Sequence, residues 1–137
     1  MRKIVYTRPD GGLSVVHPIT SEQEAWDKLP QDAINPRFVD ASEIPTDRSY
    51  RNGWKDNGVA IRHDMPKCRN LHRQKLRELR APKFLKLDAD YLRADELGDA
   101  AEKSRIASQK QALRDITAHP AIDAATTIEE LKAITIP

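Results

Sequence analysis

The sequence predicts an α+β fold, in which a small N-terminal antiparallel β part precedes a C-terminal three-helix unit arranged as a helical hairpin. Two short runs of β-branched residues flank a turn near the N-terminus, and a second turn signal follows in the middle of the chain. From residue 64 onward, apolar residues recur at spacings of three and four, as on one face of a helix. We therefore expect a β-rich part with one short helix over residues 1–62 and a helical part over residues 63–137.

The first β element is a predicted hairpin. Lys3–Thr7 and Leu13–His17 are its strands, and residues 9–12 (Pro-Asp-Gly-Gly) supply the backbone angles of the turn. An isolated hairpin is only marginally stable in water. Residues 37–40 are therefore predicted to add a further strand to it.

Local signals also place a short helix and a second hairpin. Ser21 followed three residues later by Glu24 forms a capping-box pattern that opens a helix, with Trp26 as its expected anchor in the core. Residues 49–62 are predicted to form a looser hairpin, because Asn57-Gly58 is a strong two-residue turn signal.

Caps and breakers divide the C-terminal half into helices. Asp64 is the expected N-cap of the first helix, and Pro82 is expected to break it and begin a second one. Gly98 is expected to end the second helix, Asp99 to cap a third, and Thr127 to cap a short final helix. The predicted inward-facing residues are Met65, Cys68, Leu71, His72, Leu76 and Leu79 in the first helix, Phe84, Leu85, Leu87, Tyr91 and Leu92 in the second, and Ile106, Leu113 and Ile116 in the third.

The net charge of +2 conceals a strong segregation of charge along the chain. Residues 20–47 carry a net charge of -5, and residues 62–80 carry a net charge of +5. Four arginines of the basic segment are expected to form one stripe on its helix: Arg69, Arg73, Arg77 and Arg80.

This arginine stripe has two interpretations. It could neutralise phosphates of a nucleic acid, or it could bind carboxylates and other acceptors in a protein interface. The low net charge of the chain and the lack of aromatic residues within the basic helix favour protein contacts. A small nucleic-acid-binding or regulatory protein that uses residues 62–80 is the alternative. Tyr50 and Trp54 are candidate aromatic anchors of a partner-binding surface, with ordinary core positions as the competing interpretation.

Residues able to perform chemistry are present without the spacing that catalysis or metal binding requires. His63, Cys68 and His72 are near one another in sequence, but a structural zinc site normally needs four ligands. Cys68 lies in the apolar row of its helix, where a buried thiol is inert. The acidic run is expected to be a solvated face: Asp88, Asp90, Asp95, Glu96 and Asp99. We expect neither enzymatic activity nor a metal or cofactor.

Composition restricts the class of protein further. No stretch of the 137-residue chain approaches the ~20 apolar residues that span a bilayer, and the N-terminus lacks the apolar region of a secretory signal. A single cysteine is typical of a reducing compartment. Aromatic residues make up only 5% of the chain, so we expect a small core that a partner or a second copy completes.

The stretch of residues 50–119 resembles small bacteriophage tail proteins of the tail assembly chaperone and tail-fibre assembly-associated kind. The order of its segments is an aromatic lead-in, a basic helix that ends in an Arg-x-Pro sequence, a second helix, and a helix that ends in Lys-Gln-x-Leu-Arg-Asp. The residues concerned are Tyr50-Arg51-Asn52-Gly53-Trp54, Asp64-Met65-Pro66-Lys67-Cys68-Arg69, His72, Arg77-Glu78-Leu79-Arg80-Ala81-Pro82, Leu87-Asp88-Ala89-Asp90-Tyr91, Glu96-Leu97-Gly98-Asp99 and Lys110-Gln111-Ala112-Leu113-Arg114-Asp115.

The resemblance implies a non-enzymatic protein that acts in tail or tail-fibre assembly, as a chaperone or as a minor structural component of the tail. Its partner would be a phage tail or tail-fibre protein, with homo-oligomers as a further expectation. It would act in the host cytoplasm during assembly or remain in the virion tail. No catalytic residue comes with the resemblance.

Overall fold

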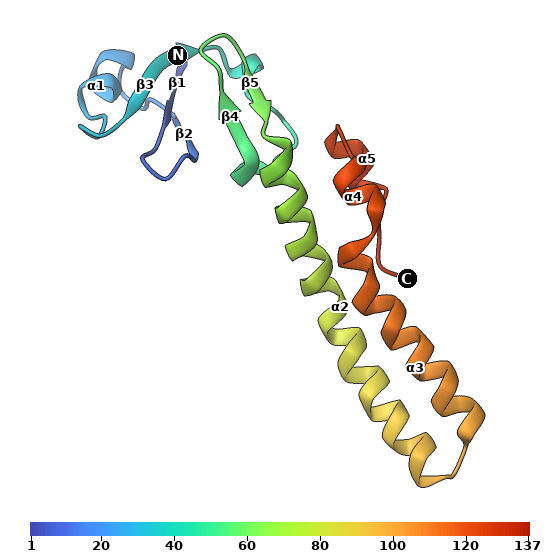
Figure 1. Cartoon of the computed structure of the whole chain (residues 1–137). Coiled ribbons are helices and arrows are strands. Elements are labelled where there is room, and N and C mark those ends of the chain that lie inside the picture. The colour runs from blue at the N-terminus through green and yellow to red at the C-terminus, as the bar shows by residue number, and fades with distance from the viewer. The chain divides into compact units, whose positions relative to one another are not determined.

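The structure, a computed structural model, describes residues 1–137 and confirms the α+β fold class (Figure 1). The chain divides into two compact units, residues 1–68 and residues 69–137. The sequence places the boundary at residues 62 and 63, close to the start of the long helix α2 (Met65–Glu96), which continues through the structural boundary. The other elements are β1 (Lys3–Thr7), β2 (Leu13–Val16), α1 (Glu22–Asp27), β3 (Ile34–Val39), β4 (Trp54–Asp56), β5 (Ile61–His63), α3 (Ala100–Asp115), α4 (Pro120–Ala124) and α5 (Ile128–Lys132), with 3-10 turns at Ala41–Glu43, Arg51–Gly53 and Ile116–Ala118.

The first unit contains a three-stranded antiparallel sheet with the order β2-β1-β3. The predicted hairpin forms with Val5 opposite Val15, and the predicted third strand pairs with β1 so that Ile4 lies opposite Phe38. Because side chains alternate along a strand, Ile4 and Val5 are buried on opposite faces of the sheet. The sheet is thus covered on both sides.

Helix α1 covers the face of the sheet that contains Ile4. Its N-cap is Ser21, whose hydroxyl accepts a hydrogen bond from the Glu24 amide at 3.1 Å, as predicted. The Trp26 ring stacks on the Phe38 ring with a centroid distance of 4.9 Å, and the Arg2 guanidinium lies 4.3 Å from the Phe38 centroid. Trp26 is half-buried, so it belongs to this stacked edge and not to the fully buried core.

The second predicted hairpin, β4–β5, covers the face of the sheet that contains Val5. Residues 57–60 form its loop, which is longer than the predicted two-residue turn at Asn57-Gly58. Gly58 in this loop has a φ of 88°, which favours glycine. Trp54 and Ile61 from this hairpin join Val5, Leu13 and Val39 in one buried cluster. The core of the first unit therefore assembles side chains from all five strands.

Helix α2 is continuous across Pro82, so the predicted break at this residue is wrong. A proline inside a helix removes one backbone hydrogen bond and costs about 3 kcal/mol. Contacts with α3 on both sides of Pro82 offset this cost: Arg80 precedes it, and Phe84 and Tyr91 follow it. The prediction of a break considers only the helix-breaking tendency of proline, because the contacts with α3 come from residues far away in the sequence.

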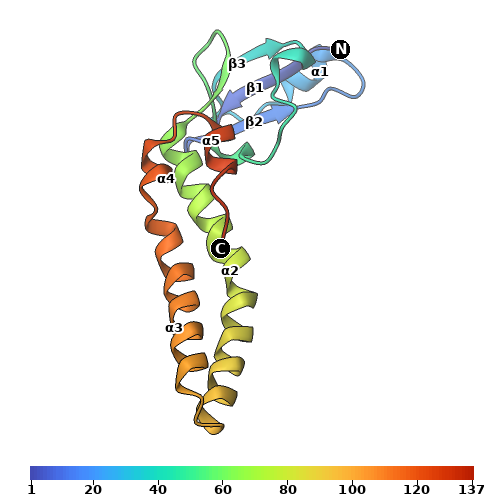
Figure 2. The same cartoon turned by 90° about the vertical axis from the view of Figure 1, so that its right-hand side faces the viewer.

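The second unit is a helical hairpin of α2 and α3 followed by two short helices. Gly98, with a φ of 66°, ends the α2 segment, and the Asp99 carboxylate caps α3 by accepting from the Glu102 amide at 3.0 Å. Thr127 caps α5 in the predicted way. Helix α4 is not predicted from the sequence, where residues 120–124 show only a proline and no periodicity. The α2 and α3 ribbons run side by side in both views (Figures 1 and 2).

A hairpin of two helices buries one side of each helix, and this corrects three predicted core residues. Cys68, Leu76, Ile106 and Leu113 are buried as expected. Leu79, Leu85 and Leu92, however, have exposed fractions of 58%, 74% and 62%. None of the helices combines the length and the apolar composition that a membrane-spanning helix requires.

Candidate interaction surface

Three arginines of the predicted stripe donate hydrogen bonds to main-chain carbonyl oxygens in the C-terminal part of the second unit. Arg69 donates to Ala125 at 2.8 Å, Arg73 to Thr117 at 3.2 Å, and Arg80 to Leu113 at 2.9 Å. Arg73 also forms an ion pair with Asp123. The acceptors lie at or just beyond the C-terminal ends of α3 and α4.

The position of these acceptors explains why arginine occupies the stripe. The last four carbonyls of a helix have no partner within the helix, and the negative end of the helix dipole lies there. A guanidinium group satisfies such carbonyls and supplies a compensating positive charge. The Arg80 guanidinium donates to Arg114 at 3.2 Å as well as to Leu113, so it binds two carbonyls in the last turn of α3. Arg69, Arg73 and Arg80 therefore link α2 to the C-terminal part of the second unit.

The remaining predicted site residues have different environments. Arg77 is exposed and has no hydrogen bond or ion pair. Tyr50 and Trp54 have exposed fractions of 1% and 2%, so both lie in the interior. Arg69, Arg73 and Arg80 thus share one role, since all three bind main-chain carbonyls in the C-terminal part of the second unit. Arg77, Tyr50 and Trp54 make no such contact.

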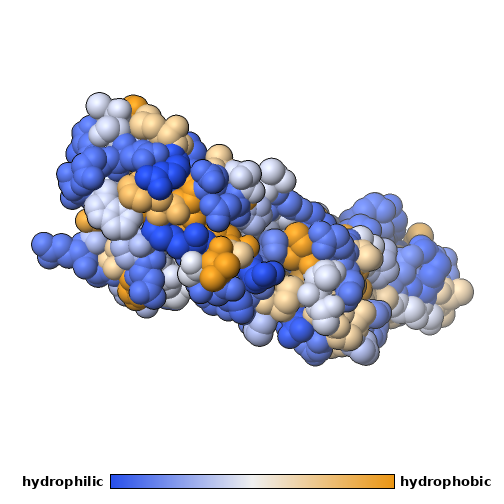
Figure 3. Space-filling view, turned by 90° about the horizontal axis from the view of Figure 1, so that it is seen from above, coloured by the Kyte–Doolittle hydropathy of each residue, from blue (hydrophilic) through white to orange (hydrophobic).

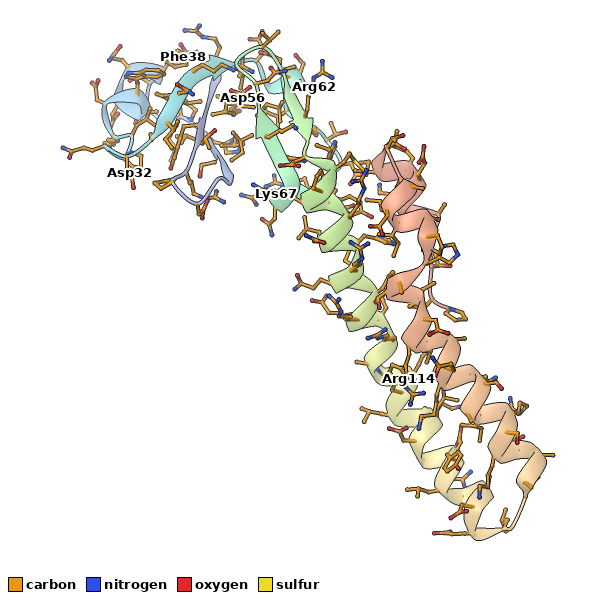
Figure 4. All side chains as sticks on the ribbon, viewed as in Figure 1. Asp32, Phe38, Asp56, Arg62, Lys67 and Arg114 are labelled. Atoms are coloured by element: carbon orange, nitrogen blue, oxygen red, sulfur yellow. The ribbon has the colours of Figure 1, made fainter.

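Cationic groups also surround the aromatic rings in the middle of the hairpin. The Arg80 and Arg114 guanidinium groups lie 5.6 Å and 5.8 Å from the Phe84 ring centroid. Arg114 comes from α3 and is labelled in Figure 4. Lys103 and Lys110 of α3 lie 5.7 Å and 5.5 Å from the Tyr91 centroid. Cation–π contacts therefore join α3 to α2 in this part of the hairpin.

The predicted acidic face is partly used for ion pairs. Asp88 binds Lys110 and Asp95 binds Lys103, each at 2.6 Å, and Asp90 lies 3.5 Å from Lys86 on its own helix. Asp95 also raises the pKa of Lys103 through their hydrogen bond. These carboxylates have ordinary ion-pair roles in a hairpin.

A groove of about 330 Å³ lies on the second unit between α2 and α3. Leu87 and Leu113 form an apolar floor with Ala112, and two lysines flank it. The Lys83 ammonium donates to the Pro137 main-chain oxygen at 2.8 Å. The full lining consists of Lys83, Lys86, Leu87, Gln109, Ala112, Leu113 and Pro137. Because the Lys83 and Lys86 ammonium groups bind Pro137 and Asp90 of the same chain, the apolar floor is the part of the groove that is open to the apolar side chains of a partner.

A second groove, of about 440 Å³, lies on the first unit beside α1. Tyr6, Val16 and His17 line one part of it, and the ion pair between Glu24 and Lys28 borders it. The sequence gives no sign of either groove, because each combines residues from separate elements. Figure 3 shows the surface from above, with apolar residues emerging as separate patches among hydrophilic ones.

Two of the three side chains considered for metal binding, Cys68 and His72, have polar contacts within the fold, whereas the buried Nε2 of His63 has no hydrogen-bond partner. His72 is buried, and its Nε2 lies 2.9 Å from the Ile134 carbonyl oxygen. Desolvation lowers the pKa of His72, and the Ile134 contact partly opposes that effect. The buried Cys68 thiol lies 3.9 Å from the Gly53 carbonyl oxygen. No group of three or more histidine, cysteine, aspartate or glutamate residues is arranged to hold a metal ion.

Comparison with known proteins gives no match among family models, curated proteins or solved structures. The resemblance to phage tail assembly proteins consequently remains a prediction from the sequence.

Proposed function

We propose that the protein acts without catalysis in phage tail or tail-fibre assembly, as a chaperone or a minor tail component, through the groove of the second unit. The supporting observation is that three of the seven residues that line this groove, those of its apolar floor, lie in the segments that resemble the tail assembly proteins. Leu87 comes from the segment of residues 87–91, and Ala112 and Leu113 come from the segment of residues 110–115.

The internal contacts of these segments agree with this proposal. The Arg-x-Pro segment contributes Arg80, whose guanidinium binds the Leu113 and Arg114 carbonyls of the Lys-Gln-x-Leu-Arg-Asp segment. The two segments that are far apart in sequence thus form one structural element, with the groove beside it. The expected occupant is a segment with apolar side chains, from a tail or tail-fibre protein of the same phage.

The nucleic-acid alternative has less support. Phosphate binding requires free guanidinium groups, and Arg69, Arg73 and Arg80 donate to carbonyl groups of their own chain. Arg77 alone of the stripe is free of such contacts.

The test uses a groove variant and a matched surface variant. Ala112→Glu places a carboxylate among the groove residues, and Ala107→Glu makes the same change at another exposed position on α3. Each variant is co-expressed with the tail and tail-fibre proteins of the phage that encodes it, and co-purification is measured. Ala112→Glu should lose the partner and Ala107→Glu should retain it. Retention by both variants, or failure of the unaltered chain to bind any tail protein, would contradict the proposal.

A second measurement distinguishes the two roles within this function. Purified mature particles are analysed by mass spectrometry for this chain. A fixed copy number identifies a tail component, and absence together with defective tails after deletion of the gene identifies an assembly chaperone.

A further inference from the structure

One side of α2 in the second unit exposes leucines that the fold leaves uncovered. Leu85 and Leu92 are 74% and 62% exposed and lie one heptad apart, so they share a line on the helix. Ala81 and Ala89 lie beside that line and are exposed too. The residues that face α3, among them Tyr91, occupy the other side of α2. Exposed apolar residues clustered in this way indicate an interface.

Two pairs of charged residues lie at the ends of this leucine line. Glu78 precedes Leu85 by one heptad on the same line, and Arg93 follows the line on one flank. Arg77 and Asp95 lie at the two ends of the other flank. In the first pair, the negative Glu78 is at the N-terminal end and the positive Arg93 is at the C-terminal end. In the second pair, the positive Arg77 is at the N-terminal end and the negative Asp95 is at the C-terminal end.

These charges are only partly used within the chain. Arg77 and Arg93 have no ion pair, and Glu78 only accepts a 3.3 Å hydrogen bond from Gln74. The Asp95 carboxylate binds Lys103 of α3, and its side chain is still 57% exposed. Three of the four groups are thus available for contacts with another molecule.

We infer that this face of α2 binds the same face of a second copy of the chain, with the two helices antiparallel. In a symmetric pair centred near residue 86, Glu78 lies level with Arg93 of the other copy, and Arg77 lies level with Asp95. Leu92 then packs on the small Ala81 of the other copy. Both of these charged pairs occur twice by symmetry, and both are attractive.

A parallel pair is disfavoured by Glu78. In a parallel pair in register, residues on the central line lie opposite their own copies, as in a coiled coil. Leu85 and Leu92 would then meet leucines, but the two Glu78 carboxylates would face each other on the same line. Like charges that face each other across an interface destabilise the complex. The antiparallel arrangement is the one that gives Glu78 a cationic partner.

The test is a charge exchange between two variants of the full chain. Glu78→Arg alone creates two arginine–arginine contacts per dimer, and Arg93→Glu alone creates two glutamate–glutamate contacts. Each variant should dimerise roughly tenfold more weakly than the unaltered chain in sedimentation equilibrium. An equimolar mixture of the two should regain the original affinity, because the introduced arginine of one copy then lies opposite the introduced glutamate of the other. Asp32→Arg, an exposed reversal in the first unit (Figure 4), is the control and should leave the affinity unchanged.

Cysteine cross-linking tests the orientation independently, since the natural Cys68 is buried. A mixture of Ala81→Cys and Leu92→Cys chains should form disulfide-linked heterodimers on oxidation, whereas Leu92→Cys alone should not cross-link. Cross-linking of Leu92→Cys with itself would overturn the antiparallel arrangement. A monomeric unaltered chain over the whole concentration series, or a mixture that fails to recover affinity, would overturn the inference. Tail-protein binding by Ala112→Glu reports on the groove alone, so failure of one proposal leaves the other intact.

Discussion

The two units of the chain reach stability by different means. The first unit has a buried apolar cluster to which all five strands contribute, and an aromatic pair covers the other side of its sheet. In the second unit, arginines of α2 bind carbonyls at helix ends, while ion pairs and cation–π contacts join α2 to α3. The difference shows that a chain with few aromatic residues can extend a long helical hairpin by using charged side chains as its cross-links.

The largest loss of stability should come from the core of the first unit. Trp54→Ala removes the largest fully buried side chain and should lower the free energy of unfolding by about 3–5 kcal/mol. Denaturant unfolding with far-UV circular dichroism measures the change. Trp54→Phe should cost much less, because the Trp54 Nε1 has no hydrogen-bond partner to lose. Equal losses in both variants would contradict the importance of apolar volume at this position.

The next largest effect concerns the single strongly buried ion pair of the first unit. Arg37 donates to both carboxylate oxygens of Asp56 at 2.8 Å, and the Asp56 side chain is 5% exposed. Asp56→Asn should cost about 2–3 kcal/mol, because it removes the bidentate carboxylate and leaves the Arg37 guanidinium with only the more distant Glu43 carboxylate at 3.7 Å. Asp10→Asn is a control at an exposed ion pair and should change stability by less than about 1 kcal/mol.

The same pair predicts a pH dependence. The Arg37 hydrogen bond lowers the pKa of Asp56 below its ordinary value. Since the folded state holds the proton less tightly than the unfolded chain, the stabilisation is complete above the ordinary pKa of aspartate, about 3.9. It is lost as the pH falls through the folded-state pKa. Unfolding measured from about pH 6 to about pH 2 should show this acid loss in the unaltered chain and a reduced loss in Asp56→Asn.

A smaller effect is expected at the start of α3. Asp99→Ala removes the carboxylate that accepts from the Glu102 amide and should cost about 1 kcal/mol. Asp99→Ser should recover most of this loss, because serine also caps helices. Thermal unfolding monitored by circular dichroism compares the two variants, and equal destabilisation by both would argue against a capping role.

The smallest expected effect is a loss of stability in mild acid that concerns the second unit and not the first. Burial lowers the pKa of His72 in the second unit, so protonation favours the unfolded chain. The stability of this unit should begin to fall below the ordinary histidine pKa of about 6.5, well before Asp56 titrates in the first unit. Hydrogen exchange of α5 amides at about pH 7 and about pH 5, corrected for the intrinsic exchange rates, measures this change with β1 amides as the internal reference. A larger loss of protection in β1 than in α5 on acidification would contradict it.

The sequence predicts those features that local chemistry determines. Ser21, Asn57-Gly58, Gly98, Asp99 and Thr127 each satisfy a backbone requirement within a few residues, and the structure has them in the predicted places. Pro82 and Leu85 are different, because their environment depends on packing against α3. Contacts with α3 keep α2 continuous at Pro82, whereas α3 does not cover Leu85. No local pattern contains this information.

The candidate site is less predictable for the same reason. The spacing of the four arginines correctly places a basic stripe on one helix, but the carbonyls that three of them bind lie 33 to 56 residues away in sequence. The groove and its apolar floor depend on the pairing of α2 with α3. A sign available in the sequence is the Arg-x-Pro and Lys-Gln-x-Leu-Arg-Asp pair of segments, which the structure joins through Arg80.

An alanine scan of the stripe tests most directly the claim that α2 arginines hold the second unit together. Arg69→Ala, Arg73→Ala, Arg80→Ala and Arg77→Ala are compared by denaturant unfolding under identical conditions. The first three should each lower the free energy of unfolding by about 1–3 kcal/mol, because they leave main-chain carbonyls without donors. Arg77→Ala should stay within about 0.5 kcal/mol of the unaltered chain. Equal effects at all four positions, or none at the first three, would contradict the claim.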